Sequence, residues 1–539
     1  MWNGMLQNKV SKKRLILFIF ISTIALYFIF SPALNFFYYG GDDFRYAFGG
    51  WNKTCASDDG FYFAGTVGRP IQAYMDCLNY KFANTLEHMR VVRLVALALL
   101  GCSMGLLAEW LYLLGFSVWI AFFGAGSFIL INRLYGDTIL TGATSLASPV
   151  LLVVLAHLCI RRARSYSSEL QKKNRLVWFS VSAILIFCAL LTYPAMTFFY
   201  GTLVLITLLS SNLVNWTQTR RDVLQDVILF CAVCVLYFIW AYFNMRYNAH
   251  APIPDAYRLD HPNFNLIEIY KRAIPLFNLF DGAWMLLPLT NSIWQGTALV
   301  IVLVGGVLIA IARFFQSQFY LQNKPVALNT VGQAIVGVFV LLLFSSAFFL
   351  MMPGRDSVGS RLIFATMASF LPLIFWCLYQ WSAIFPASLK KNVFAILVCL
   401  IFLMEAYQAN LLGMVSATGA ADKLNAMKTV ISDYLVKGNK LRRIHFIVPE
   451  SDYPYNKFFL VNAALAQLPG DQKNELIWCS LPRGFSGEEK DHQKEAISCI
   501  EKLPANSIAV TYSHVGEPIK KTDSMLMITG DPQRIELNK

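Results

Sequence analysis

Eleven long apolar runs separated by short polar loops dominate the chain, and this pattern predicts a bundle of membrane-spanning helices. Two loops are much longer than the others, residues 35–89 and 244–292. We therefore expect residues 1–412 to form a transmembrane domain with two large loops. The runs cover residues 15–34, 91–113, 116–132, 147–160, 176–192, 195–213, 223–243, 294–312, 330–350, 361–381 and 392–412.

From about Gly413 the pattern changes to short strand and helix signals. A run of strands alternating with a helix implies a small α/β domain over residues 413–539. We find no catalytic motif in it, so a binding or docking role is favoured. Its predicted strands are residues 441–450, 475–481, 506–513 and 524–530, and its predicted helix is residues 456–470.

Composition supports a polytopic membrane protein and excludes an ordinary soluble one. The chain is 56% hydrophobic and 14% charged, with a mean hydropathy of +0.51. The formal charge of +13 does not indicate nucleic-acid binding, because residues 413–539 are balanced at 16 basic and 15 acidic side chains. The surplus lies mainly in short loops between apolar runs, which is the positive-inside pattern. It predicts a multi-pass protein of the plasma (inner) membrane, with the N-terminus cytoplasmic and the C-terminal domain outside.

The first long loop opens with two adjacent carboxylates, Asp42 and Asp43, in the stretch FFYYGGDDFRYAFGGW. If this stretch is helical, Asp42 and Arg45 lie three residues apart on one face, where the cation favours an ionised carboxylate. Such a group suits a general base. The alternative is a helix start with acids at its positive end and an aromatic belt at the headgroups.

Several cations also fall on the side predicted to be outside, and they are candidates to hold an anion. The alternative for Arg355 and Arg361, in MMPGRDSVGSR, is that they are ordinary flanking arginines. Glu405 within the last run is either a site residue or an acid satisfied inside the bundle. The candidate cations are Arg45, Arg69, Lys271, Arg272, Arg355 and Arg361.

Seven of the eleven cysteines lie in apolar runs, where they behave as small hydrophobes. Cys55 and Cys77 in the first long loop, and Cys479 and Cys499 in the tail, form two separated pairs. Two such pairs fit disulfides in an oxidising compartment. Four unrelated free thiols are the alternative.

The stretch GGDDFRYAFGGWN followed by VGRPIQAYMD resembles the serotype-converting O-antigen glucosyltransferases of the GT-C superfamily, which use polyprenyl-phosphate donors. DDFRYA is also similar to the Asp-Glu-x-Arg-Tyr-Ala motif of aminoarabinose and mannosyl transferases of that superfamily. On this match Asp42 takes the place of the catalytic Asp and Asp43 that of the Glu. The resemblance implies a GT-C-like fold and transfer of one sugar, glucose in that family, to a glycan acceptor such as O-antigen on the outer membrane face.

Such chemistry needs a base for the acceptor hydroxyl and cations for the leaving lipid phosphate. A single displacement would invert the anomeric centre, which we favour over a covalent intermediate on Asp43. Whether a divalent cation binds the Asp pair stays open. Two other readings remain: a ligase or polymerase of lipid-linked glycans, and a transporter or flippase of lipid-linked sugars.

Overall fold

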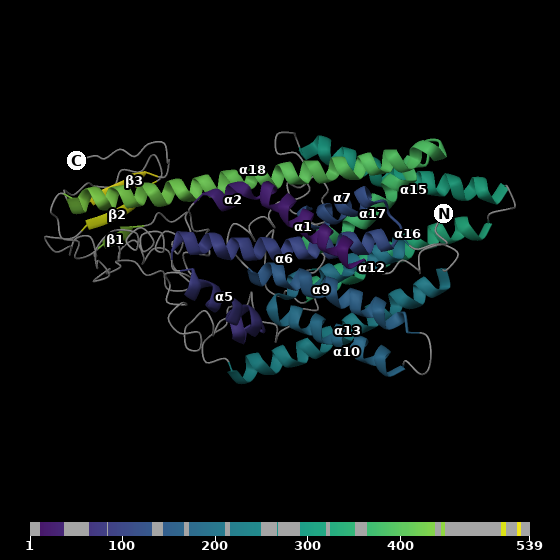
Figure 1. Cartoon of the computed structure of the whole chain (residues 1–539), viewed down its shortest axis with the longest axis horizontal. Helices are drawn as coiled ribbons and strands as arrows, with labels where there is room; N and C mark the ends of the chain where they lie inside the picture. Colours follow the sequence, from purple (N-terminus) through teal and green to yellow (C-terminus); the bar gives the residue numbers. More distant parts are fainter. Residues whose placement is uncertain are drawn as a thin grey trace. The chain divides into compact units, whose positions relative to one another are not determined.

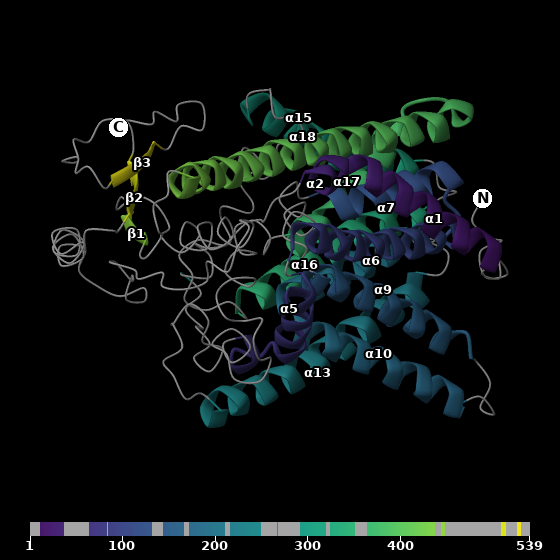
Figure 2. The same cartoon turned by 60° about the vertical axis from the view of Figure 1, so that its left-hand side comes forward.

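The computed structural model shows an α-helical membrane protein (Figures 1 and 2). Contacts between Cα atoms divide it into two compact units, the first formed by Met1–Leu34, Cys55–Asn79 and Arg90–Gly413, and the second by the remaining residues. The structure describes residues 11–36, 64–83, 85–131, 144–166, 172–210, 216–248, 267, 292–319, 324–350, 364–436, 444–447, 508–513 and 525–529.

A helix overlaps each of the eleven predicted apolar runs. The helices are α1 (Lys12–Ile29), α2 (Ser31–Asn35), α5 (Pro70–Phe82), α6 (Leu86–Leu113), α7 (Val118–Leu130), α9 (Thr144–Arg164), α10 (Lys172–Thr192), α11 (Pro194–Thr197), α12 (Phe199–Leu209), α13 (Trp216–Asn248), α15 (Ser292–Phe319), α16 (Lys324–Leu350), α17 (Phe364–Ser382) and α18 (Ala387–Val436).

Among the described residues, seven helices are long and apolar enough to cross a membrane: α6, α9, α10, α13, α15, α17 and α18. Shorter apolar helices lie in the runs of α7, α11 with α12, and α16. The coarse prediction of a helical membrane protein is thus confirmed, while the count of eleven spans stays a prediction.

Polar contacts at both ends of α13 define the two ends of the first unit. Asp226 near its start binds Arg164 at the end of α9, and Asn244 near its end binds the backbone around Gly65. These two α13 residues are separated by about 27 Å at 1.5 Å per residue, close to the thickness of a bilayer core. We call the end at Asp226 the Arg164 end. The end at Asn244, where the turn that includes Gly65 leads to Arg69, is the Arg69 end.

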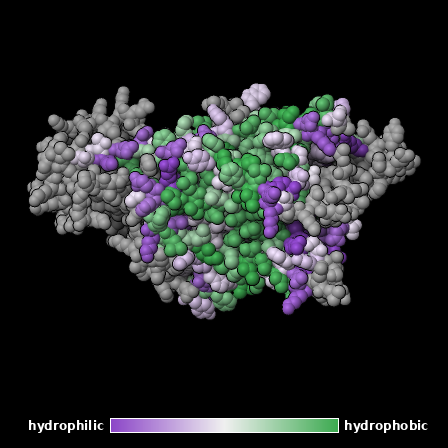
Figure 3. Space-filling model, in the orientation of Figure 1, coloured by the Kyte–Doolittle hydropathy of each residue, from purple (hydrophilic) through white to green (hydrophobic). Residues whose placement is uncertain are grey.

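Between these ends α13 exposes apolar side chains, among them Ile228, Val235 and Ile239. Figure 3 shows a band of apolar residues flanked by polar ones on the visible face. An exposed apolar belt of this kind fits lipid rather than water.

Helices α1 and α6 lie antiparallel. The Arg14 guanidinium donates two hydrogen bonds of 2.6 Å each to the Glu109 carboxylate, near the end of α6. Trp110 beside Glu109 has its ring 4.8 Å from that of His157 on α9, which places this pair toward the Arg164 end. The basic start of α1 is thereby fixed to one side of the apolar belt.

Two glycines on α6 allow α1 to approach closely. A Cβ atom at Gly105 would lie 2.6 Å from the backbone N and Cα of Ile19, and one at Gly101 would lie 2.9 Å from the Cα of Thr23. Glycines four residues apart permit such backbone contact between membrane helices. Only glycine therefore fits at these two positions.

Gly105→Leu is expected to lower the free energy of unfolding by about 1–3 kcal/mol or more, because the side chain would push α1 away. Thermal melting in detergent measures the loss. Gly413→Leu on α18 is the matched control, since a Cβ there meets nothing within 4 Å. Equal melting temperatures for both variants would contradict the close approach.

Gly115 ends α6 and begins the turn to α7. Its φ is 93°, a conformation that L side chains rarely adopt. The Gly115 amide donates to the Tyr112 carbonyl at 2.9 Å and the Phe116 amide to the Leu111 carbonyl at 3.3 Å, the two bonds of a Schellman motif. Ser117 then caps α7 by accepting from the Ile120 amide.

Helix α12 lies at the centre of the first unit, and nearly all of its side chains are buried. It packs against α9, α13, α16 and α17. The Thr202 hydroxyl is 3.1 Å from that of Ser369 on α17, which joins the two helices by a buried hydrogen bond. Helix α10 packs on both α9 and α13.

The last helix, α18, crosses the predicted domain boundary at residue 412. It is one helix of 50 residues that continues to Val436, or about 75 Å, far longer than a bilayer core. The composition shift at Gly413 therefore marks a change of polarity along one helix and no break in it.

Three of the four strands predicted in the tail are present: β1 (Ile444–Ile447), β2 (Ile508–Ser513) and β3 (Met525–Thr529). They pair in parallel in the order β1-β2-β3, with Ile444 opposite Ile508 and Ala509 opposite Met525. The predicted helix 456–470 and strand 475–481 lie outside the described residues, so the α/β domain stays a prediction.

Candidate functional site

Two of the predicted site residues, Arg69 and Cys77, lie in the described part of the chain. Both belong to the segment that enters and forms α5. The other predicted residues lie outside the described ranges: Asp42, Asp43, Arg45, Lys271, Arg272, Arg355, Arg361, Cys55, Cys479 and Cys499.

The GRP sequence forms a tight turn immediately before α5. The Arg69 amide donates to the Ala64 carbonyl at 2.8 Å, and the Gly68 amide donates to the Gly65 carbonyl at 3.2 Å. Gly68 has a φ of 87°, which strains any L side chain. Pro70 then begins α5, where its missing amide proton costs no hydrogen bond.

Helix α13 holds this turn through side-chain hydrogen bonds. The Asn244 amide nitrogen donates to the carbonyls of Gly65 at 2.8 Å and Thr66 at 3.1 Å, and the buried Tyr237 hydroxyl donates to the Gly68 carbonyl at 3.1 Å. Buried carbonyls that a turn leaves unpaired are thus satisfied. The turn is fixed to the rigid bundle at three points.

Arg69 itself is half-buried and directed by an aromatic ring. Its Cζ lies 5.3 Å from the ring centroid of Tyr193, which separates α10 from α11 in extended backbone. A cation–π contact orients the guanidinium but leaves donors for an anion. Arg69 is therefore a cation presented by a preorganised turn.

Helix α5 is fixed to the start of α9 on its other side. The Asn79 amide donates to the Thr144 hydroxyl at 2.5 Å, and Gln72 donates to Asp76 at 3.1 Å within α5. Cys77 on α5 is buried and disulfide-bonded, as predicted, whereas its pairing with Cys55 stays a prediction. The seven cysteines of the apolar runs are free.

Helix α1 spans the first unit from the Arg164 end to the Arg69 end. Helix α1 runs from Arg14, at the Arg164 end, to Ile29, whose carbonyl accepts a 2.8 Å bond from Asn410. The N-terminal part of the first unit ends at Leu34, and the unit resumes at Cys55.

Arg93 is a cation that the sequence-based set of outer cations omits. It lies two turns into α6, toward the Arg69 end, and its side chain is fully buried. A permanently charged guanidinium in such a place needs compensation by anionic or polar groups. The signal was present in the sequence, as a basic residue inside the run 91–113.

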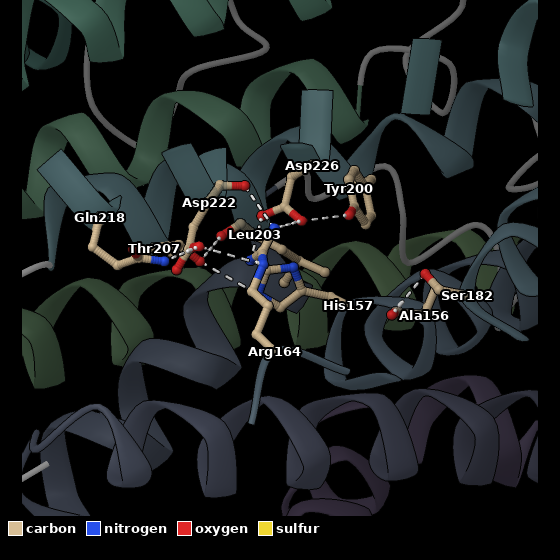
Figure 4. Close-up of polar contacts among 10 residues, drawn as sticks. All are labelled: Ala156, His157, Arg164, Ser182, Tyr200, Leu203, Thr207, Gln218, Asp222 and Asp226. Carbon is tan, nitrogen blue, oxygen red and sulfur yellow. Dashed lines mark hydrogen bonds and ion pairs between the residues drawn. The ribbon is translucent and has the colours of Figure 1, made fainter. Parts of the chain in front are cut away.

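A second polar cluster lies at the Arg164 end (Figure 4). Arg164 binds the fully buried Asp226 with two hydrogen bonds, of 2.7 and 3.2 Å, and also donates to the Asp222 carbonyl at 2.6 Å. The Tyr200 hydroxyl donates to Asp226 at 3.3 Å. Arg161 interacts electrostatically with both aspartates, so two cations face two anions.

His157 extends this cluster between α6, α9 and α12. Its Nε2 is 3.3 Å from the Thr207 hydroxyl, and its ring packs edge-on against Trp110 and Tyr200. Because the charges balance and the groups are buried, the cluster joins α9, α12 and α13 and offers no cation to a ligand. Its role is structural.

Glu405 is buried on α18, and neither carboxyl oxygen has a hydrogen-bond partner in the ranges described. Ser127 on α7 lies within interaction range. Both alternatives for Glu405, a site residue and an acid satisfied inside the bundle, stay predictions.

Groups of three or more potential metal ligands are absent from the described residues. No protein family, curated protein or solved structure matches the chain.

Proposed function

We propose that the chain is a membrane glycosyltransferase of the GT-C type. It would move a single sugar, glucose by the resemblance, from a polyprenyl-phosphate carrier to a glycan acceptor such as O-antigen. Asp42 would act as general base and Asp43 would assist it. The support is the DDFRYA and GRP motifs together with the helical membrane fold.

The structural observation that carries this proposal is the turn of residues 64–69. A motif inferred from sequence alone proves to be held by Tyr237 and Asn244, with Arg69 oriented by Tyr193. A preorganised cation is what the leaving phosphate of this reaction requires.

In the proposed reaction, Asp42 and the cations have separate roles. The Asp42 carboxylate would take the proton of the acceptor hydroxyl as its oxygen attacks the anomeric carbon. The bond from that carbon to the phosphate oxygen would break, and the leaving phosphate would gain negative charge. Attack from the opposite face inverts the centre. The cations proposed for the phosphate are Arg45, Arg69, Lys271, Arg272, Arg355 and Arg361.

The orientation proposed is cytoplasmic for the Arg164 end and outer for the Arg69 end. Among the described residues, the first of these ends collects most of the basic side chains, as positive-inside topology requires. The predicted α/β domain after α18 would then lie outside and dock the acceptor glycan. Basic residues described at the cytoplasmic end include Lys12, Lys13, Arg14, Arg161, Arg162, Arg164, Lys173, Arg175, Arg220 and Arg221.

The proposal is tested with the full chain in detergent and a water-soluble short-chain polyprenyl phosphate glucose. Transfer of labelled glucose to a glycan acceptor, with release of polyprenyl phosphate, supports it. Transfer of a whole glycan instead indicates a ligase or polymerase. Movement of the lipid across a vesicle without bond cleavage indicates a flippase.

Arg69→Ala is expected to weaken donor binding about tenfold or more, because a hydrogen bond to a charged group contributes about 1.5–3 kcal/mol. Arg69→Lys should rescue only part of it, since lysine lacks the planar fork. Donor titration gives the apparent affinity. Arg246→Ala, an exposed cation at the same end of α13, is the control. Unchanged affinity in Arg69→Ala would assign this arginine to structure.

A further inference from the structure

Five basic side chains gather where α9, α10 and α13 meet at the Arg164 end. We call this the basic patch: Arg162, Lys173, Arg175, Arg220 and Arg221. Four of them are exposed, and Arg175 is half-buried. None has an acidic partner within the described ranges, in contrast to neighbouring Arg164, which Asp222 and Asp226 neutralise.

Aromatic rings pre-order three of these guanidinium groups. The Cζ atoms of Arg162, Arg175 and Arg220 lie 5.2, 5.7 and 5.6 Å from the ring centroids of Tyr166, Phe179 and Trp216. Each ring is four residues from its arginine. Such a contact restricts the side chain before any ligand arrives, so less conformational entropy is lost on binding.

Exposed apolar side chains lie directly beneath the basic patch, toward the membrane centre. On α13, Leu224 and Ile228 follow Arg220 at intervals of four residues, and each is 58% exposed. On α10, Leu176 and Val177 follow Lys173 and are also exposed. Because α10 packs on α13, the two apolar strips belong to adjacent helices.

We propose that this surface binds an anionic phospholipid. The cations would hold the headgroup phosphate, which guanidinium groups bind with paired hydrogen bonds. The acyl chains would lie along the strips of α10 and α13. Five cations over three helices favour a lipid with two phosphates over one with a single phosphate. This inference does not depend on glycosyl transfer.

Native mass spectrometry of the full chain in detergent, titrated with defined lipids, tests the proposal. Cardiolipin and phosphatidylglycerol should bind more tightly than phosphatidylcholine. Arg220→Gln with Arg221→Gln should weaken cardiolipin binding about 30-fold, since each cation near a membrane surface contributes about 1 kcal/mol. Lys390→Gln with Lys391→Gln, on α18, removes two charges elsewhere and should leave it unchanged.

Three outcomes would overturn the proposal. They are equal binding of anionic and zwitterionic lipids, an equal loss in both double variants, and displacement of the lipid by inorganic phosphate at the same concentration. Circular dichroism confirms that the variants fold. If the arginine variant does not fold, the salt dependence of the unaltered protein decides, because binding should weaken as sodium chloride rises from about 0.05 to 0.5 M.

Discussion

Asp42→Asn should abolish sugar transfer while the protein remains folded. An amide cannot take the proton of the acceptor hydroxyl, and loss of a general base typically costs on the order of 100-fold or more in rate. Asp43→Asn should impair transfer strongly. The measurement is turnover of short-chain polyprenyl phosphate glucose by the purified full chain, with the melting temperature recorded for each variant.

Asp58→Asn provides the matched control, since it removes another carboxylate from the same loop and should keep turnover near that of the unaltered protein. Donor affinity separates a base from a ligand for the phosphate. A base variant loses turnover at unchanged donor affinity, because the lost interaction exists only in the transition state. Near-normal turnover of Asp42→Asn would remove Asp42 from the mechanism.

The hydrophobic periodicity and the distribution of charge along the sequence predicted those features of the fold that depend on whether a segment contacts lipid or water. Apolar runs must become helices in lipid, because a helix satisfies its own backbone hydrogen bonds there. The positions of α1 and α6, with Arg14 bound to Glu109, agree with that reasoning. The helix that contains the run at 392–412 extends beyond it, because hydropathy falls at Gly413 while helix formation continues to Val436.

Features that depend on packing between distant segments were missed. Nothing in the sequence indicates that Gly105 lies against Ile19, since a glycine in an apolar run fits many neighbours. Tyr237 and Asn244 hydrogen-bond to the turn at Gly68, although more than 160 positions along the chain separate them from it. Arg69 was chosen from its motif, but its orientation follows from these contacts and from Tyr193.

The buried pair of Arg164 and Asp226 was likewise missed, since Arg164 was assigned to a basic loop and Asp226 lies within the predicted apolar run 223–243. The pair joins α9 to α13 at the membrane boundary, with Asp226 fully buried and Arg164 10% exposed. Two charges desolvated in this way are held by each other and by Tyr200. Removing one of them leaves the other without compensation.

Asp226→Asn is therefore expected to lower the free energy of unfolding by about 3 kcal/mol, because breaking a buried ion pair costs about 3–5 kcal/mol. Asparagine keeps the shape of the side chain, so the loss reports charge and not a cavity. Thermal or chemical unfolding in detergent measures it. Asp222→Asn should cost much less, because its carboxylate is 18% exposed and lies 3.6 Å from the Arg164 Nε.

Replacing both partners distinguishes an ion pair that stabilises the fold from one that is merely costly to break. Arg164→Met combined with Asp226→Leu removes both charges and fills the space with apolar atoms, so most of the loss should be recovered. The Tyr200 hydroxyl would lose its acceptor and retain a cost of about 1 kcal/mol. If the double variant were as unstable as Asp226→Asn, the cluster of α9, α12 and α13 would depend on the hydrogen-bond network itself and not on the compensation of Arg164.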